Sequence, residues 1–213
     1  MTESQVARSS TPSAPITAAQ GVGLVSALTF DDGPNGEATE RLLDFLEDRA
    51  IRATFCVIGQ NVTAPGGAEL LQRMVRAGHV LCNHSTTHVD MGKWEWDAIE
   101  ADLVNTLQII RDAVGDEDVP VPYFRAPHGS WGQTGLVAAA LGMRSLDVIN
   151  VIDDWVTQDV PTLISKLRTA MRPSELVLTH DGGGDREGTV DAVIAIVTER
   201  LAEGWTFTLP LDN

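Results

Sequence analysis

Two short motifs contain residue types that bind metal ions. Asp31 and Asp32 stand side by side after an apolar run and before a Gly-Pro turn, and His84 and His88 lie four positions apart after another apolar run. If the segment 84–88 turns helically, both imidazoles lie on one face and can hold one cation, with a carboxylate as third ligand. An ordinary polar turn and two solvated histidines are the alternatives. We predict a metal site of Asp32, His84 and His88, with Asp31 facing the substrate.

This set of ligands is typical of a catalytic site. Structural zinc sites are usually closed by four protein ligands and favour Cys, whereas two histidines and one carboxylate leave positions open for water. A cation lowers the pKa of such a water to about 7 in favourable cases. We therefore expect a divalent metal, with Zn²⁺ as the first choice and Co²⁺, Ni²⁺ or Fe²⁺ as alternatives that suit the same donors.

A third motif places Arg125 at the end of an apolar run, before a turn that contains His128. Beside an acidic site, the guanidinium could hold and orient Asp31. A surface ion pair is the alternative. The backbone N–H groups of the turn could bind a developing oxyanion.

Two further motifs, around Asp154 and His180, favour a proton donor. A strand-end histidine that is backed by a carboxylate from the neighbouring strand has the features of a general acid, because the carboxylate raises the pKa of the imidazole and fixes its tautomer. His180 taken alone would carry no such implication. Its position after an apolar run, like the other motifs, makes it part of one pattern.

The polar motifs follow the ends of apolar runs, which predicts that strands position them. Short strand-like runs alternate with helical patterns, the clearest of which lie within 96–114 and 190–201, and this order is typical of β/α units around a parallel sheet or barrel. In such barrels the carboxyl ends of the strands meet on one face, where active sites are built. We expect seven strands, at 24–30, 52–58, 79–83, 121–125, 145–151, 176–180 and 206–209.

The chain of 213 residues fits one domain with a substantial core. Residues 1–20 are rich in Ser, Thr, Ala and Pro, so we expect a flexible N-terminal tail there and a catalytic domain over 21–213. The tail lacks the apolar stretch of a signal peptide, and no run approaches the roughly 20 apolar residues of a membrane span. We therefore expect a cytoplasmic protein, or a secreted one if a leader was removed.

The net charge argues against several classes of partner, and the cysteine content indicates how the thiols are used. With 30 acidic and 15 basic residues, the chain has a net charge of -15, which argues against nucleic acid and anionic membrane surfaces as partners. The same charge tolerates neutral substrates and attracts metal cations. Cys56 and Cys82 are the only cysteines, and we expect two buried thiols, with a single disulfide as the alternative.

These motifs, in this order, resemble those of carbohydrate esterase family 4, the NodB-homology polysaccharide deacetylases. The resemblance extends over residues 24–209, and its most specific motifs are Thr-Phe-Asp-Asp-Gly-Pro at 29–34 and His-Ser-x-x-His at 84–88. It implies an α/β fold, a distorted (β/α)₇ barrel, which agrees with the seven expected strands. It also implies removal of acetyl groups from carbohydrates.

The resemblance implies a role for each residue that matches a family motif. Trp131 could stack on a sugar ring, although packing in the core is an equal alternative. The implied general base is Asp31, held by Arg125; the general acid is His180, partnered by Asp154; the metal ligands are Asp32, His84 and His88; the oxyanion donor is the backbone N–H of His128; and the pocket around the acetyl methyl is shaped by Trp155 and Leu178.

Three features depart from the family pattern. His128 replaces the usual Tyr or Phe, and Val151 and Ile152 replace the usual Asp and Ser or Thr of the fourth motif. The third departure is the missing secretion signal, which favours a small intracellular acetylated sugar over an extracellular polymer.

Several functions are compatible with these motifs. N-acetyl removal from an acetamido sugar, such as a chitooligosaccharide, is the leading expectation, and O-acetyl removal, as from acetylated xylan, shares every motif. A metallohydrolase of another amide is a further hypothesis. A carbohydrate-binding protein without catalysis would be expected to lose the base, a ligand or the acid, and the chain retains all of them. The sequence makes no prediction of the oligomeric state.

Overall fold

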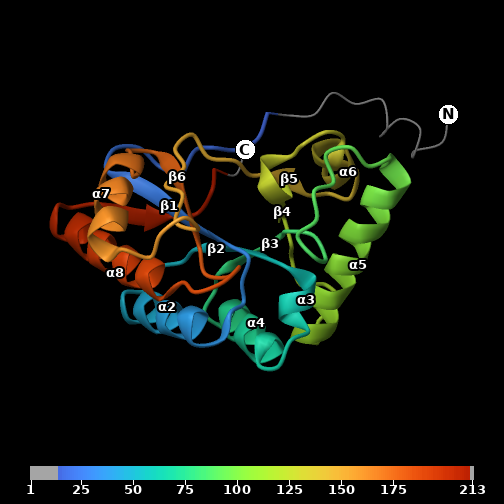
Figure 1. Ribbon diagram of the computed structural model, residues 1–213, viewed down its shortest axis with the longest axis horizontal. Coiled ribbons are helices and arrows are strands. Elements are labelled where there is room, and N and C mark those ends of the chain that lie inside the picture. The colour runs from blue at the N-terminus through green and yellow to red at the C-terminus, as the bar shows by residue number, and fades with distance from the viewer. Residues whose placement is uncertain (1–13, 212–213) are drawn as a thin grey trace.

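The computed structural model describes residues 14–211, which build a curled, seven-stranded sheet. Every pair of neighbouring strands is parallel. The strands follow the order β5-β4-β3-β2-β1-β6, and β7 pairs with the first residues of β1 (Figure 1). The strands are β1 (Val25–Asp31), β2 (Thr54–Val57), β3 (Val80–Asn83), β4 (Tyr123–Phe124), β5 (Arg144–Ser145), β6 (Glu175–His180) and β7 (Thr206–Thr208).

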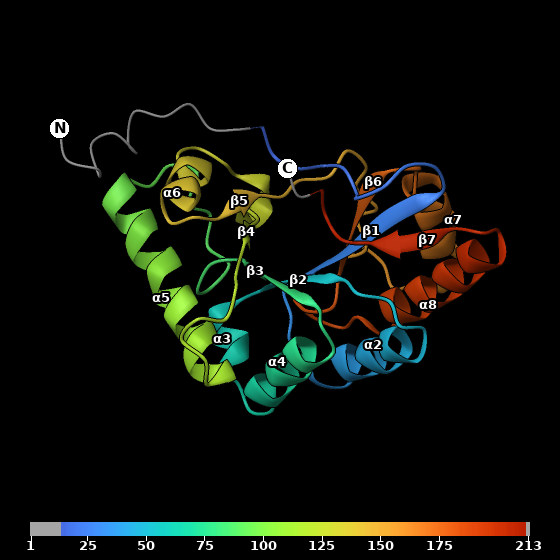
Figure 2. The same cartoon turned by 180° about the vertical axis from the view of Figure 1, so that it is seen from behind.

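Helices surround the sheet, as the views from both sides show (Figures 1 and 2). Within residues 14–211, none of them is both long and apolar enough to cross a membrane. The predicted helical patterns at 96–114 and 190–201 lie in α5 (Trp96–Val114) and α8 (Glu187–Ala202). The helices are α2 (Gly36–Asp48), α3 (Gly59–Val62), α4 (Gly67–Arg76), α5 (Trp96–Val114), α6 (Thr134–Ala140), α7 (Val160–Ala170) and α8 (Glu187–Ala202), with a 3-10 turn η1 (Pro127–Gly129) after β4.

The architecture confirms the predicted distorted barrel, and all seven predicted strands are present. The prediction for 145–151 was wrong over most of its length, since β5 ends at Ser145. The side chain of Asp147 accepts the backbone N–H of Val148 at 2.8 Å, which turns the chain away from the sheet. Ile149 and Val151, which follow, are exposed and lie outside the strands.

A segment before β1 links the two edges of the curled sheet. Ile16 forms a parallel bridge with Leu146, directly after β5, and Ala18 forms an antiparallel bridge with Glu175 at the start of β6. Residues 16–20 therefore lie between the edge strands, whereas we expected a flexible tail over 1–20. Residues 1–13 of that predicted tail lie outside the described part of the chain. Backbone groups on the sheet edges need partners, and this segment supplies some of them.

The barrel interior is filled in layers by side chains that alternate along the strands. Ala27 and Leu176 lie at the same level in register, Thr29 and Leu178 form the next level, and Asp31 and His180 the last. Because successive side chains of a strand point to opposite faces, the interior changes from apolar to polar toward the carboxyl ends. The thiols of Cys56 and Cys82 are buried and form no disulfide, which confirms the expectation of two buried thiols, and they pack in a small apolar cluster with Ala27 and Leu176. The carboxyl ends of the strands are thus the polar end of the barrel.

The packing of α5 gives a test of this description. Leu103 is fully buried, with 0% of its surface exposed, in a core cluster that also contains Ile99 and Phe124. The next residue, Val104, is 47% exposed. We expect Leu103→Ala to lower the free energy of unfolding by about 2 to 5 kcal/mol, because it removes buried methyl groups and leaves a cavity. Val104→Ala is the matched control and should change it by less than about 0.5 kcal/mol. Urea titrations followed by circular dichroism measure both, and equal losses would contradict the packing of this helix.

Candidate active site

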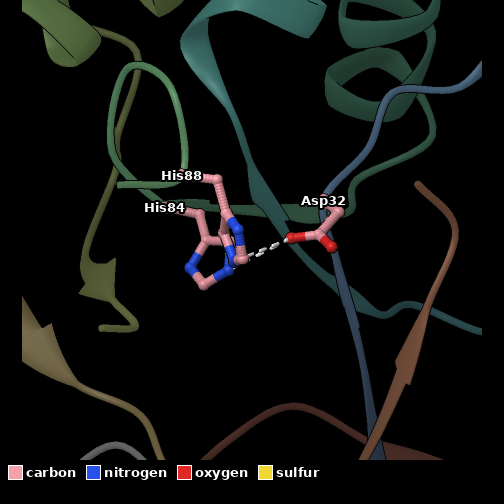
Figure 3. Close-up of side chains that lie close together, drawn as sticks. All are labelled: Asp32, His84 and His88. Atoms are coloured by element: carbon pink, nitrogen blue, oxygen red, sulfur yellow. Dashed lines mark ion pairs between the residues drawn. The ribbon is translucent and has the colours of Figure 1, made fainter. Parts of the chain in front are cut away.

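Three side chains from two loops supply the donor atoms that a metal ion requires. Oδ1 of Asp32 lies 3.3 Å from Nε2 of His84 and 3.4 Å from Nε2 of His88 (Figure 3). One donor atom from each residue lies within 4.8 Å of the other two. Asp32 follows β1 and the histidines follow β3, so the predicted trio meets at the carboxyl ends of the strands.

The loops reach this arrangement by uncommon backbone angles. The two histidines meet without the helical turn that we considered for 84–88: Ser85 and His88 have φ angles of 67° and 61°, and the segment contains no helix. Oγ of Ser85 accepts the backbone N–H of His88 at 3.0 Å, which folds the loop back on itself. Asp32 is also left-handed, with φ 71°, so a turn rather than the alternation of an extended strand separates its carboxylate from that of Asp31.

The donor set fits a divalent cation. Nδ1 of His84 lies 2.8 Å from the carbonyl oxygen of Arg125, and since a carbonyl only accepts, Nδ1 carries the hydrogen and Nε2 keeps its lone pair. Oδ1 of Asp32 is buried and has no hydrogen-bond partner within residues 14–211. Burial alone would raise the pKa of Asp32, but the neighbouring histidines, His84 first, lower it to about 2. An ionised carboxylate oxygen without a partner, next to a lone pair of fixed direction, is what a cation requires.

One carboxylate oxygen of Asp31 contacts Arg125, and the other lies near His84 of the candidate metal site. Nη1 of Arg125 donates to Oδ1 of Asp31 at 2.6 Å and to Oγ1 of Thr29 at 3.0 Å. Oδ2 lies 3.6 Å from Nε2 of His84. Burial alone would lower the pKa of the Arg125 guanidinium, but Asp31 raises it above its ordinary value. The predicted contact between Arg125 and Asp31 is therefore present, and it is a buried ion pair rather than a surface one.

His180 and Asp154 form a second, separate pair. Oδ1 of Asp154 lies 2.7 Å from Nδ1 of His180, and Oδ2 accepts the backbone N–H of the same residue at 2.8 Å. Asp154 is fully buried, and His180 is mostly buried. Burial alone would lower the pKa of His180, but the hydrogen bond and charge of Asp154 raise it. Nδ1 is thus directed at the carboxylate, and Nε2 is the nitrogen left to exchange a proton.

Trp155 packs on His180, and His128 packs on His88. The Trp155 ring meets the His180 ring edge to face, with centroids 5.3 Å apart, and 51% of Trp155 is exposed. His128 packs against His88 with ring centroids 4.3 Å apart, and its Nε2 lies 3.2 Å from the carbonyl oxygen of His88. The side chain of His128 therefore supports the loop of a predicted metal ligand, a contact that the sequence did not indicate.

The two remaining predicted pocket residues are Leu178 and Trp131. Leu178 is at the register position of Thr29, two residues before His180, so it forms the layer beneath the polar end. Trp131 is partly buried and packs edge to face on Phe124, with ring centroids 6.1 Å apart, against the core cluster that contains Leu103. For Trp131 the structure shows the packing contact that was the alternative to a sugar-stacking role.

A cavity of about 450 Å³ opens beside the candidate metal site of Asp32, His84 and His88. Among the predicted site residues within 14–211, Asp32 and His88 line it. Side-chain amides that the sequence did not single out also face it, and Nδ2 of Asn61 donates to the backbone carbonyl of Asp32 at 2.7 Å. Gln60 and Asn61 follow β2, a strand whose end carries none of the motifs. The cavity is lined in addition by Asn35, Gln60, Gly183 and Gly184.

Asp181 supports the loop that carries Asp31 and Asp32, a role that the sequence did not reveal. It is fully buried, its backbone N–H donates to the carbonyl of Asp31 at 3.1 Å, and its Oδ2 accepts the hydroxyl of Thr39 at 2.5 Å. Burial raises the pKa of Asp181 to about 7. Gly33 has no space for a side chain, because a Cβ atom would collide with this carboxyl group.

Comparison with known proteins gives the same result from sequence and from structure. The sequence profile of the polysaccharide deacetylase family matches residues 22–146. A chitooligosaccharide deacetylase of Bradyrhizobium sp. (strain ANU 289) is 36% identical over 168 residues, which cover 78% of this chain and 75% of that protein.

Solved structures agree with this match. The Xyl-CE4 domain of a multidomain xylanase from the hindgut metagenome of Trinervitermes trinervoides superposes with a TM-score of 0.76 at 31% identity, over 87% of this chain and 86% of that one. A family 4 acetyl xylan esterase from Clostridium thermocellum, in complex with a cobalt ion, gives a TM-score of 0.76 at 27% identity, over 87% of each chain. The profile match, the relatives and the shared fold show that this chain belongs to the polysaccharide deacetylase family, carbohydrate esterase family 4.

Proposed function

We propose that this protein is a metal-dependent hydrolase that removes the N-acetyl group of an acetamido sugar, such as a chitooligosaccharide. The observation that carries the proposal is the arrangement at the polar end of the barrel. The trio Asp32, His84 and His88 could hold a metal ion. Next to it lies Asp31, whose carboxylate is held by Arg125. His180, which is held by Asp154, pairs in register with Asp31 on the neighbouring strand. A base and an acid thus flank one cation site.

Each of these groups has a distinct task in hydrolysis of an acetamide. When bound, a divalent cation supplies Lewis-acid chemistry, since it polarises an acyl oxygen and makes a water more acidic. Asp31, oriented by Arg125, accepts the proton of the attacking water. His180 donates a proton from Nε2 to the leaving nitrogen, and Asp154 stabilises the imidazolium and its orientation. The backbone N–H of His128 is the proposed donor to the developing oxyanion.

We propose Zn²⁺ as the cation. Two imidazole nitrogens and one carboxylate oxygen, with further positions open, are typical of catalytic zinc sites. Co²⁺, Ni²⁺ and Fe²⁺ suit the same donors, so the metal supplied in the cell also affects which one is bound.

O-acetyl removal from xylan is the second candidate. It is supported by the similarity to the acetyl xylan esterase, which has the same fold over most of both chains. Acetate release from N-acetylglucosamine oligomers and from acetylated xylan, at equal metal content, distinguishes the two. We expect at least about tenfold higher kcat/KM on the amide, which corresponds to about 1.4 kcal/mol in transition-state stabilisation. The reverse preference would replace the first candidate by the second.

Asparagine variants of the two adjacent aspartates should separate base from ligand. Asp32→Asn removes the ionised donor, so we expect loss of bound metal together with activity. Asp31→Asn should retain metal and lose about 10² to 10⁴ in rate, because a base acts on the water and not on the cation. Elemental analysis and acetate release measure both effects. The opposite pattern, metal loss in Asp31→Asn alone, would exchange the two roles.

Asp154 should set the pH above which activity falls. A general acid must be protonated, and Asp154 raises the pKa of His180, so Asp154→Asn should lower that pKa and move the alkaline limb of the pH profile to lower pH. Asp153→Asn is the matched control, because this neighbouring carboxylate is exposed and faces Lys166 instead. We expect its limb to stay in place.

His180→Ala completes this test, since a metal-activated water also titrates near neutrality. The variant should lose most activity on an acetamido sugar and much less on nitrophenyl acetate, because an amine leaving group needs a proton and an activated phenol does not. Equal losses on both substrates would show that His180 is not the proton donor.

A further inference from the structure

A second cavity, of about 640 Å³, lies at the opposite end of the barrel from the metal cluster. It is lined by the last turns of α2 and α4 and by the residues that lead into β2 and β3, and these two helices lie side by side in both views (Figures 1 and 2). All the strands are parallel, so their starts lie away from the active site. The volume is in the range of small-molecule sites.

His79 lines this cavity and carries a buried hydrogen-bond donor without a partner in the described residues. Its Nδ1 accepts the backbone N–H of Ala53 at 3.1 Å, so in the neutral ring the hydrogen is on Nε2. Only 6% of His79 is exposed, and Nε2 is buried without a hydrogen-bond partner within residues 14–211. Burial lowers the pKa of His79 to about 4, so the ring is neutral near pH 7. A buried N–H of this kind needs an acceptor.

Positive charge collects around this donor, although the whole chain has a net charge of -15. Three of the fifteen basic residues, Arg52, Arg73 and Arg76, line the cavity with a single acidic residue, Glu47. Arg73 is occupied by ion pairs with Glu47 and Asp44. In the described part of the chain, Arg52 and Arg76 form no ion pair and leave their guanidinium groups for a ligand.

Several of the acceptors that border this cavity already have hydrogen-bond partners. The cavity is bordered by two helix ends, where carbonyl groups would otherwise be available. Backbone N–H groups of the following turns already donate to them, including that of Ile51 to Leu46 and that of His79 to Met74. The side-chain donors that remain without a partner among residues 14–211 are His79 Nε2–H and the guanidinium groups of Arg52 and Arg76, and the two guanidinium groups are charged.

We propose that this cavity binds the oxyanion of a small molecule, a phosphate ester or a carboxylate, with His79 Nε2–H at the bottom and the guanidinium groups of Arg52 and Arg76 at the rim. The planar guanidinium group matches both kinds of oxyanion. The site is separate from the deacetylase centre, and its occupancy does not depend on the proposed function.

The test uses the full chain, loaded with its metal and labelled with ¹⁵N-histidine, which gives separate ring signals for five histidines. Inorganic phosphate and acetate are the two probes. We expect at least one of them to shift the Nε2 signal of His79 saturably. Anions that bind at the metal shift the signals of His84 and His88 instead, so the two sites are read separately. Tighter binding of phosphate assigns the site to phosphate esters, and tighter binding of acetate assigns it to carboxylates.

Two variants test the role of the arginines. Arg52→Gln/Arg76→Gln removes the charges at the rim, and we expect it to weaken the anion affinity at the His79 signal by about tenfold, or about 1.4 kcal/mol. Arg172→Gln is the matched control, since this exposed arginine lies outside the cavity, and its affinity should stay within about twofold. No saturable shift of His79 with either probe, or equal affinity in the double variant and the control, would overturn the proposal.

Discussion

The site depends on one residue, Arg125, because its backbone and its side chain contact different parts of the machinery. The carbonyl oxygen accepts the hydrogen of His84 Nδ1 and so fixes which nitrogen faces the cation. The guanidinium holds Asp31 through one nitrogen at 2.6 Å. The backbone N–H donates to the carbonyl of Asn83, directly before His84, and so continues the pairing of β4 with β3. Strand pairing, the proposed metal site and the position of the proposed base are therefore coupled at one buried position.

Burial makes these contacts obligatory. Arg125 and Asp31 are both almost completely removed from water, and so is Asp154 beside His180. A buried charge without its partner is strongly destabilising, typically by 3–5 kcal/mol, whereas an exposed pair contributes about 0–1 kcal/mol. The surface ion pairs of this chain, such as Arg168 with Glu199, belong to the second class. The same burial that orients the catalytic groups thus makes them sensitive to loss of either partner.

The sequence predicted the types of elements and which candidate site residues lie at the strand ends better than the backbone that joins them. Strand-end positions of Asp31, Arg125 and His180 follow from apolar runs and the rule that parallel strands end on one face, and the structure places all three there. The extent of β5 could not be predicted, because Val148 and Ile149 have strand character but Asp147 turns the chain first. The order of residues 16–20 also depends on long-range pairing with β6, which a local pattern of Ser, Thr and Pro does not show.

The conformation of the ligand loops shows why the remaining part of the site escaped prediction. Asp32, Ser85, His88, His128 and Asp153 are non-glycine residues with positive φ angles, and all lie in the loops around the metal cluster or beside Asp154. Such angles are uncommon for residues with a Cβ atom and persist where the surroundings determine them. Here the surroundings are identifiable: Ser85 Oγ holds the N–H of His88, and Asn61 holds the carbonyl of Asp32. Ser85 belongs to the motif at 84–88, but the motif does not indicate this contact, and Asn61 belongs to no motif, so both contacts can be read only after the strands are in place. The motifs therefore indicate the candidate reacting groups, and contacts made both within and outside the motifs determine where those groups point.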